Sequence, residues 1–485
     1  MLQGIRFAAS AALVIVAATT ANAGLNEDIG YASLADRLGP ATPDAAGLVI
    51  AQVEASETQI GQPVAFVPDP VVFPGITFTY HPDLADPANH ISTHATNVAG
   101  YLYGSSSIAS GAGSVQVHQT NTYLTSMLRP FAGGDPQAPV VHAADVYNHS
   151  YDDQTNIAAT DYTLRLNHVI DRDRLTVVVT TDNDVVVTTD NDNDADSGLS
   201  DLFAQTHNAI VVGRSDGEHA YGPTSIAGAG RVKPDIVAPL PGTSYAAPVV
   251  AASAALLIDQ ARSTPALVDA DRPEVVKAAL MAGAVKEPFG ADWDRTASRP
   301  LDEVYGAGQV NIDRSHRIIT AGPQDSAAAV ANTGWDFAST DAAPTRYHFN
   351  VAPGQSITEL SAVLTWHQTV HDAAANEPDR FAPTADPLAN LDLKLFLLPT
   401  AGPEVLLDAS ISSVDNVEHI HYAAGLAPGE YALQVKSDLA EIDYGLAWHS
   451  TAIPEPAAAA LLTALAAAHL FIRRRRTAGA IRRAT

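Results

Sequence analysis

The chain changes its pattern of apolar and polar positions near residue 321. Before that point, short β-branched runs alternate with longer segments of helical period. The strand-like runs include 47–53, 175–180 and 210–213, and the helical segments include 97–103, 159–170, 245–261 and 274–282. Strands that alternate with helices are typical of a parallel sheet covered by helices. We therefore predict an α/β domain over residues 24–320.

Residues 321–333 are rich in Gly, Pro, Ser and Ala, and we interpret them as a linker. The pattern of apolar and polar residues is different after this segment. Runs such as 391–397 and 431–435 alternate apolar and polar residues with a period of two, and Pro and Gly turns bound them. This alternation is typical of antiparallel strands that bury one face. We predict an antiparallel β-sandwich over residues 334–452.

The first 23 residues carry a targeting pattern. They contain Arg6, an apolar run from Phe7 to Ala18 and the small-x-small sequence Ala21-Asn22-Ala23. These features are typical of a secretory signal peptide, which signal peptidase removes. We predict that residues 1–23 are absent from the mature protein.

The other end, residues 453–485, carries a second pattern. Pro454-Glu455-Pro456 precedes an uncharged apolar segment at 457–472 and an arginine cluster at 473–476. This order resembles the PEP-CTERM sorting tail of Gram-negative bacteria. The resemblance implies processing by an exosortase, a transient anchor through a transmembrane helix at 457–472, and delivery to the cell surface or extracellular matrix. A plain tail anchor is the alternative.

The net charge and the amino-acid composition exclude some kinds of binding partner and site. The chain has 27 basic and 54 acidic residues, a formal net charge of -27, and no cysteine. Seven of the basic residues lie in the two targeting segments, so 20 bases face 54 acids in residues 24–456. This excess argues against nucleic acid or an anionic membrane surface as the main partner. The absence of cysteine excludes disulfides, thiolate zinc sites and cysteine nucleophiles.

One heptapeptide indicates the chemistry. Gly242-Thr-Ser-Tyr-Ala-Ala-Pro248 precedes a continuous apolar segment, 249–258, which we predict to be a buried helix. A serine at the amino end of a helix lies close to the positive end of the helix dipole, which favours a developing oxyanion. The heptapeptide resembles the serine motif of subtilisin-like peptidases, the subtilases. The resemblance implies that Ser244 is a nucleophile.

An upstream motif supplies the expected general base. The sequence His94-Ala-Thr-Asn-Val-Ala-Gly100 resembles the histidine motif of subtilases, with Ala95 and Asn97 in place of the family's glycine and second histidine. The resemblance implies that His94 takes the proton of Ser244.

The motif expected to supply the orienting carboxylate matches the family less closely than the serine and histidine motifs do. The family's first motif is an apolar strand that ends in aspartate, and the corresponding run at 49–56 puts Glu54 in that position. The glutamate side chain is one methylene longer. Asp69, Asp83 and Asp86 are alternatives, although each lies in a Pro-rich loop.

Two further motifs concern the substrate and the oxyanion. The run at 146–150 resembles the family's Asn-x-Ser strand, which implies that Asn148 and Ser150 border the substrate cleft through their backbone. The octapeptide 177–184 recurs identically as 185–192 and resembles the strand before the family's oxyanion asparagine. We prefer Asn183 as the oxyanion donor, with Asn191 as the alternative, and interpret one copy as a surplus loop.

The resemblance continues through 231–239, 273–280 and 305–311, so it covers roughly residues 47–320 in the family's order. It implies the three-layer subtilase fold for this region.

Metal sites have weaker signals. Asp190, Asp192 and Asp194 alternate in one loop and offer oxygen ligands to calcium, but no glycine occupies the sharp-turn position. We favour a solvated acidic loop, with no cofactor required and calcium possible. The histidines at 367, 419 and 421 lack the ligand spacing of a zinc site, so we interpret them as sandwich surface.

Our leading hypothesis is a secreted, surface-sorted serine endopeptidase that hydrolyses protein or peptide substrates through a Ser/His/carboxylate triad and an acyl-enzyme. The alternative is a catalytically degenerate subtilase fold that serves as a structural or adhesive protein of the extracellular matrix. Glu54 and the altered histidine motif favour that alternative. A carboxylate-serine peptidase of the sedolisin kind is disfavoured, because that group lacks a histidine base and His94 is present.

Overall fold

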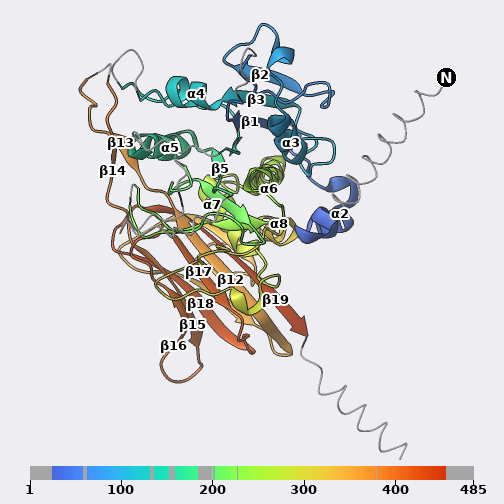
Figure 1. Ribbon diagram of the computed structural model, residues 1–485. Coiled ribbons are helices and arrows are strands. Elements are labelled where there is room, and N and C mark those ends of the chain that lie inside the picture. The colour runs from blue at the N-terminus through green and yellow to red at the C-terminus, as the bar shows by residue number, and fades with distance from the viewer. Residues whose placement is uncertain are drawn as a thin grey trace, which may run out of the picture.

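The computed structural model describes residues 24–57, 63–130, 136–151, 159–183, 203–226, 228–377 and 380–454, together with Leu199 (Figure 1). The predicted signal peptide, the second copy of the repeat and the predicted transmembrane helix of the sorting tail lie outside these residues. So do Asp190, Asn191, Asp192 and Asp194.

The first part of the fold is a seven-stranded sheet in the order β2-β3-β1-β4-β5-β6-β9. Every neighbouring pair in it is parallel. Its strands are β1 (Val49–Glu54), β2 (Thr77–His81), β3 (Ser114–Gln119), β4 (Val146–His149), β5 (Thr176–Thr180), β6 (Ile210–Arg214) and β9 (Ile236–Ala238). This confirms the predicted parallel α/β core.

Helices cover both faces of this sheet. They are α2 (Tyr31–Leu38), α3 (Thr93–Leu102), α5 (Ala159–Asp173), α6 (Thr243–Ser263), α7 (Pro273–Gly283) and α8 (Ile312–Thr320), with a shorter α4 (Thr120–Thr122). Residues of α3, α6, α7 and α8 share one hydrophobic cluster, and residues of α5 belong to a second. The sheet therefore separates α3 and α6 from α5, as the three-layer expectation requires.

Helix α6 is apolar almost all round because it runs through the core. Among the described residues it alone is long and apolar enough to cross a membrane, and 78% of its most apolar window is buried inside the fold. Burial within the protein accounts for that composition.

The second part is a pair of four-stranded antiparallel sheets, β10-β19-β12-β17 and β11-β18-β15-β16. The strands are β10 (Gly334–Ser339), β11 (Thr345–Val351), β12 (Gln355–Trp366), β15 (Leu391–Leu398), β16 (Val405–Ser410), β17 (Val417–Tyr422), β18 (Gly429–Ser437) and β19 (Asp443–Pro454). Two minor pairs, β7 (Gly222–Pro223) with β8 (Val232–Lys233) and β13 (Val370–Asp372) with β14 (Pro383–Ala385), complete the strands. The predicted antiparallel domain is confirmed.

The sheet that contains β12 is covered on both sides. Leu364 and Trp366 belong to the core between the two antiparallel sheets, whereas Val363 belongs to the core of the α/β part. On that second side Thr365 Oγ1 donates a hydrogen bond to the backbone oxygen of Glu274 in α7, at 2.7 Å. The antiparallel domain is thus packed against α7 by a face that an isolated sandwich would leave in water.

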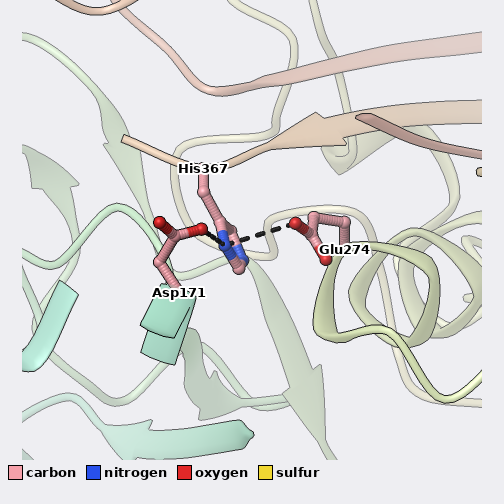
Figure 2. Close-up of side chains that lie close together, drawn as sticks. All are labelled: Asp171, Glu274 and His367. Carbon is pink, nitrogen blue, oxygen red and sulfur yellow. Dashed lines mark hydrogen bonds and ion pairs between the residues drawn. The ribbon is translucent and has the colours of Figure 1, made fainter. Parts of the chain in front are cut away.

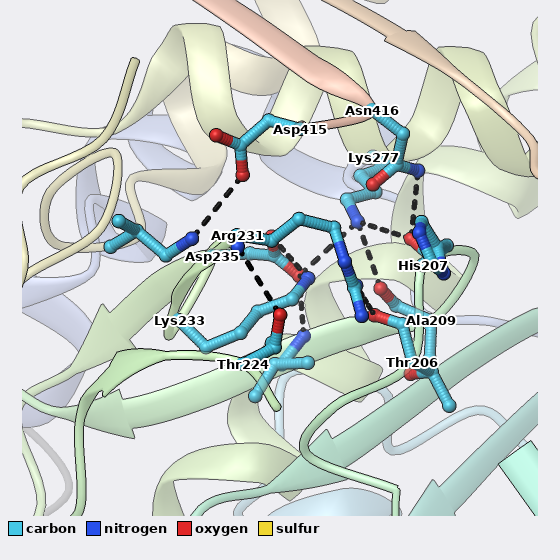
Figure 3. Close-up of polar contacts among 12 residues, drawn as sticks. Thr206, His207, Ala209, Thr224, Arg231, Lys233, Asp235, Lys277, Asp415 and Asn416 are labelled. Carbon is cyan, nitrogen blue, oxygen red and sulfur yellow. Dashed lines mark hydrogen bonds and ion pairs between the residues drawn. The ribbon is translucent and has the colours of Figure 1, made fainter. Parts of the chain in front are cut away.

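A buried polar network reinforces this contact (Figure 3). Lys233 Nζ lies 2.8 Å from Asp235 Oδ1, and Lys277 Nζ lies 3.2 Å from Asp235 Oδ2. Asn416, just before β17, donates through Nδ2 to the backbone oxygen of His207 at 2.9 Å. Buried charges and hydrogen-bond donors are costly unless they have partners, and these groups have them. The Lys-Pro-Asp sequence at 233–235 therefore has a structural role at the junction.

The interpretation of the sandwich histidines as surface residues is wrong. His419 has no exposed area, and the His367 side chain is 8% exposed. Both lie on or beside the sheet that faces the α/β part, where packing between domains removes them from water.

Candidate active site

The topology concentrates polar side chains at one edge of the parallel sheet. Strands β2 and β3 extend the sheet on one side of β1, while β4, β5, β6 and β9 extend it on the other. Crevices form where the strand order reverses in this way, outside the carboxyl ends of the strands. Glu54 is the last residue of β1, and Asn183 follows β5 by three residues.

The pleat of β1 decides which way Glu54 points. Ile50 belongs to the hydrophobic cluster on the α3 side, and Ala51 and Val53 belong to the cluster on the α5 side. Because successive strand residues face opposite sides, Gln52 and Glu54 share the α3 side with Ile50.

Helix α3 brings His94 to the same place. Ser92 is its N-cap, and the Ser92 side chain accepts a hydrogen bond from the backbone N–H of Ala95 at 3.0 Å. The helix begins at Thr93, four residues before the segment predicted from the sequence, so His94 lies in its first turn. His94 Nδ1 lies 2.8 Å from Glu54 Oε2.

Glu54 is held from its other side as well. Gln52 Nε2 donates to Glu54 Oε1 at 2.7 Å and to the backbone oxygen of Ala95 at 2.9 Å. The Tyr103 hydroxyl donates in turn to Gln52 Oε1. Both carboxylate oxygens therefore have fixed partners, and the longer glutamate side chain is accommodated without loss of the contact to His94.

The contact between His94 and Glu54 changes the pKa values of both side chains. The hydrogen bond to Glu54 raises the pKa of His94 above its usual value, against the opposing effect of burial. Burial raises the pKa of the Glu54 carboxyl, and the hydrogen bond from His94 offsets this only in part. A buried carboxylate that contacts Nδ1 stabilises the imidazolium and leaves Nε2 as the basic atom.

The start of α6 presents Ser244 with an unused backbone donor. Gly242 is the N-cap and has no side chain to cap the helix, but Asn183 Oδ1 accepts the N–H of Thr243 at 2.9 Å. Within the described residues, the N–H of Ser244 has no acceptor. The N–H of Ser244 and the Asn183 side-chain amide are therefore the candidate donors to an oxyanion at the start of α6.

The helices that hold His94 and Ser244, α3 and α6, pack against each other. The ring of Tyr245 lies 6.1 Å from the ring of His94, centroid to centroid, and 5.6 Å from that of Tyr101. In the described part of the chain, no hydrogen bond joins the Ser244 hydroxyl to His94. Hydrogen bonds of this kind are often long without substrate and tighten when it binds.

A cavity of about 620 Å³ adjoins these residues. Asn97, Tyr101 and Tyr245 line it, together with apolar residues such as Phe73 and Val249. His94, Asn97 and Tyr101 are three and seven positions apart, so one face of α3 carries both the histidine and part of the cavity wall.

The remaining predicted residues are less exposed or not described. Asn148 and Ser150 are both fully buried, and Asn148 Nδ2 donates to Ser150 Oγ at 2.8 Å. Neither their side chains nor their backbone is exposed, so in this structure they do not border an open cleft. None of the rival carboxylates, Asp69, Asp83 and Asp86, has a hydrogen bond or ion pair with His94.

Three residues of the site were missed in the sequence: Gln52, Ser92 and Tyr103. The position of Gln52, two residues before Glu54 on a strand, is a signal that places it on the same face. Tyr103 carries no such signal, because only the packing of α3 on β1 brings its hydroxyl to Gln52.

Comparison with known proteins gives a family match in the α/β part of the chain. Residues 78–308 match the family profile described as Subtilase family, Peptidase_S8. This range includes His94, Asn183 and Ser244 and begins after Glu54. No curated protein matches the chain significantly.

Two solved structures are similar to parts of this chain. A protease from Pseudoalteromonas arctica PAMC 21717 is 16% identical, with 57% of this chain and 91% of that chain covered and a TM-score of 0.34. A pre-peptidase C-terminal domain of a collagenase from Bacillus anthracis is 15% identical, with 24% and 89% covered and a TM-score of 0.16. The family match supports a subtilase-family domain at residues 78–308, slightly less than half of the chain.

Proposed function

We propose that this protein is a serine endopeptidase in which Ser244, His94 and Glu54 form the catalytic triad. The observation that carries the proposal is the 2.8 Å contact between His94 Nδ1 and the buried Glu54 Oε2, near the start of the helix that holds Ser244. An imidazole oriented by a carboxylate beside a serine is the arrangement that activates a hydroxyl for acyl transfer.

We infer the following reaction for these residues. Ser244 Oγ attacks the peptide carbonyl carbon while its proton passes to His94 Nε2, and Glu54 stabilises the resulting imidazolium. The oxyanion accepts hydrogen bonds from the Ser244 N–H and the Asn183 side-chain amide. The C–N bond then breaks as His94 returns the proton to the leaving amine, and water hydrolyses the acyl-enzyme by the same path.

Export and sorting belong to the same proposal. The signal-peptide pattern at 1–23 and the sorting pattern at 453–485 support a protein that crosses the inner membrane and is delivered to the cell surface or extracellular matrix. The acidic excess of the remaining chain argues against nucleic acid or an anionic membrane surface as the main partner.

The proposal is tested by reacting the purified protein with a fluorophosphonate probe. We expect the parent to be labelled, Ser244→Ala to remain unlabelled, and Ser105→Ala, which removes a serine at the wall of the adjacent cavity, to be labelled like the parent. Peptide hydrolysis by Ser244→Ala should fall by about 10⁶-fold, as for removal of other serine nucleophiles.

Absence of labelling in a parent shown to be folded by circular dichroism would reject catalysis and favour the structural or adhesive alternative. Equal labelling of the parent and Ser244→Ala would place the nucleophile elsewhere.

A further inference from the structure

A second group of titratable residues lies at the junction between the two parts of the fold, away from the triad (Figure 2). Asp171 belongs to α5, Glu274 to the first turn of α7, and His367 directly follows β12. Their ligand atoms all lie within 4.8 Å of one another. These positions are about a hundred residues apart in the sequence, so spacing could not reveal them.

The two distances from the imidazole are close to those between ligands of a shared ion. His367 Nδ1 lies 3.1 Å from Asp171 Oδ1 and 3.3 Å from Glu274 Oε1. Two ligands on a tetrahedral zinc ion, each bonded at about 2.0–2.2 Å, are separated by roughly 3.3–3.5 Å. A single Nδ1–H, in contrast, points along one line and cannot donate well to both carboxylates.

An unsatisfied atom points to the same conclusion. Glu274 is 5% exposed, and its second carboxylate oxygen, Oε2, is buried without a hydrogen-bond partner. Buried polar atoms are nearly always paired, and a cation held by this cluster would supply the partner that Oε2 lacks. Two carboxylates and a neutral imidazole around a dication also leave no net charge.

Space and access are present as well. The three residues line a cavity of about 250 Å³ that also borders Glu441 and Asp443. The Asp171 side chain is 40% exposed, so water can reach the cluster and complete the coordination shell. Of the two cavity arginines, Arg272 is already paired with Asp269 at 3.1 Å.

We propose that Asp171, Glu274 and His367 bind a divalent transition-metal ion, zinc by its donor set, that joins the peptidase core to the antiparallel domain. One imidazole nitrogen with carboxylate oxygens suits zinc and its neighbours, whereas calcium and magnesium prefer oxygen alone. The ion links α5, α7 and the end of β12. This role is independent of the catalytic proposal.

Zinc binding to the untagged full chain, stripped with a chelator and then freed of it, tests the site. We expect calorimetry with ZnCl₂ to show one ion per chain with micromolar or tighter affinity. Cobalt should give the visible absorption of a low-coordinate nitrogen and oxygen site. Zinc should also raise the melting temperature of the parent, because an ion that binds only the folded state stabilises it.

Matched variants identify the ligands. His367→Gln and Glu274→Gln should weaken zinc binding by more than the 10- to 100-fold typical of outer-shell changes. His371→Gln should bind like the parent, since it removes a neighbouring histidine–aspartate pair, His371 with Asp386, that is half exposed. A stripped parent that binds no zinc would overturn the proposal, and this outcome does not depend on the folding of any variant. Equal zinc affinity of the parent and His367→Gln would also overturn it.

Discussion

At the scale of single residues, the orienting carboxylate of the proposed triad is a glutamate. Its extra methylene matters only if the carboxylate is displaced from the imidazole, and here it is not. Glu54 Oε2 meets His94 at 2.8 Å, while Oε1 is fixed by Gln52 at 2.7 Å. The residues around the pair are therefore matched to glutamate, and the substitution is compatible with an oriented base.

The pH dependence of hydrolysis should report this contact. Because His94 acts only when neutral and Glu54 raises its pKa, kcat/KM of the parent should fall on the acid side of a pKa above the usual histidine value. In Glu54→Gln the negative charge is lost, so the acid limb should move to lower pH. The plateau should fall by about 10⁴-fold, since an amide no longer selects the correct tautomer.

Asp69→Asn is the control for that experiment. Asp69 is a rival carboxylate from the sequence, and in the structure its side chain accepts the N–H of Val71 at 3.0 Å. It should leave both the plateau and the acid limb as in the parent. A loss in Asp69→Asn similar to that in Glu54→Gln, or no change in either variant, contradicts the assigned triad.

At the scale of elements, the start of α3 positions the base. Ser92 lies two residues before His94. Its hydroxyl accepts a hydrogen bond from the Ala95 N–H, which caps the helix, and donates one to Glu57 Oε1 at 2.6 Å. This N-cap also fixes the position of the His94 imidazole, because His94 lies in the first turn of the helix. The position of His94 thus depends on the geometry of this cap.

Removal of the cap should weaken both stability and turnover. Ser92→Ala should lower the free energy of unfolding by about 0.5–2 kcal/mol, the usual cost of losing a serine cap. It should also lower kcat more than KM, because a displaced His94 affects the reaction and not the binding of substrate. Urea denaturation and steady-state kinetics measure the two effects.

Thr93→Ala provides the comparison, since Thr93 is the exposed neighbour in the same turn. Its effect on stability should stay within about 0.5 kcal/mol, as for ordinary surface positions. If the two variants behave alike, the cap does not position His94.

At the scale of the whole molecule, the two parts of the fold meet through close backbone packing. A Cβ atom at Gly445 in β19 would lie 2.6 Å from the backbone carbon of Glu274 in α7. No real Cβ contact is that short, and backbone atoms of a buried helix cannot move aside freely. The glycine is required for the approach of β19 to α7.

Gly445→Ala should therefore separate or strain the junction. We expect a loss of about 1–3 kcal/mol, typical of overpacking in a dense core, and faster cleavage by an added protease near the 321–333 segment. Denaturation curves and limited proteolysis followed by mass spectrometry give the readouts.

Gly429→Ala in β18 is the matched control. Its nearest neighbours would lie at 3.7 Å, an ordinary contact distance. Stability of that variant should be close to that of the parent. Equal destabilisation of the two variants would mean that the cost comes from glycine replacement in a strand and not from the junction.

The sequence by itself determined the elements and much of the site. Alternation of β-branched and helical segments predicts the parallel core, and period-two runs predict β15 and β18, because these patterns reflect local burial. Ordered motifs also identify Ser244, His94 and Glu54 as a candidate triad, since each motif lies on a recognisable strand or helix end.

The tertiary structure decided what depends on contacts between distant segments. The second half of β12 is buried on both faces because α7 covers the side that alternation assigns to solvent. The His367 side chain and His419 are removed from water for the same reason. Tyr103 reaches Gln52, and Asp171, Glu274 and His367 meet, only after helices pack on sheets. Local periodicity records whether a residue is buried, but packing alone determines the residues that it contacts.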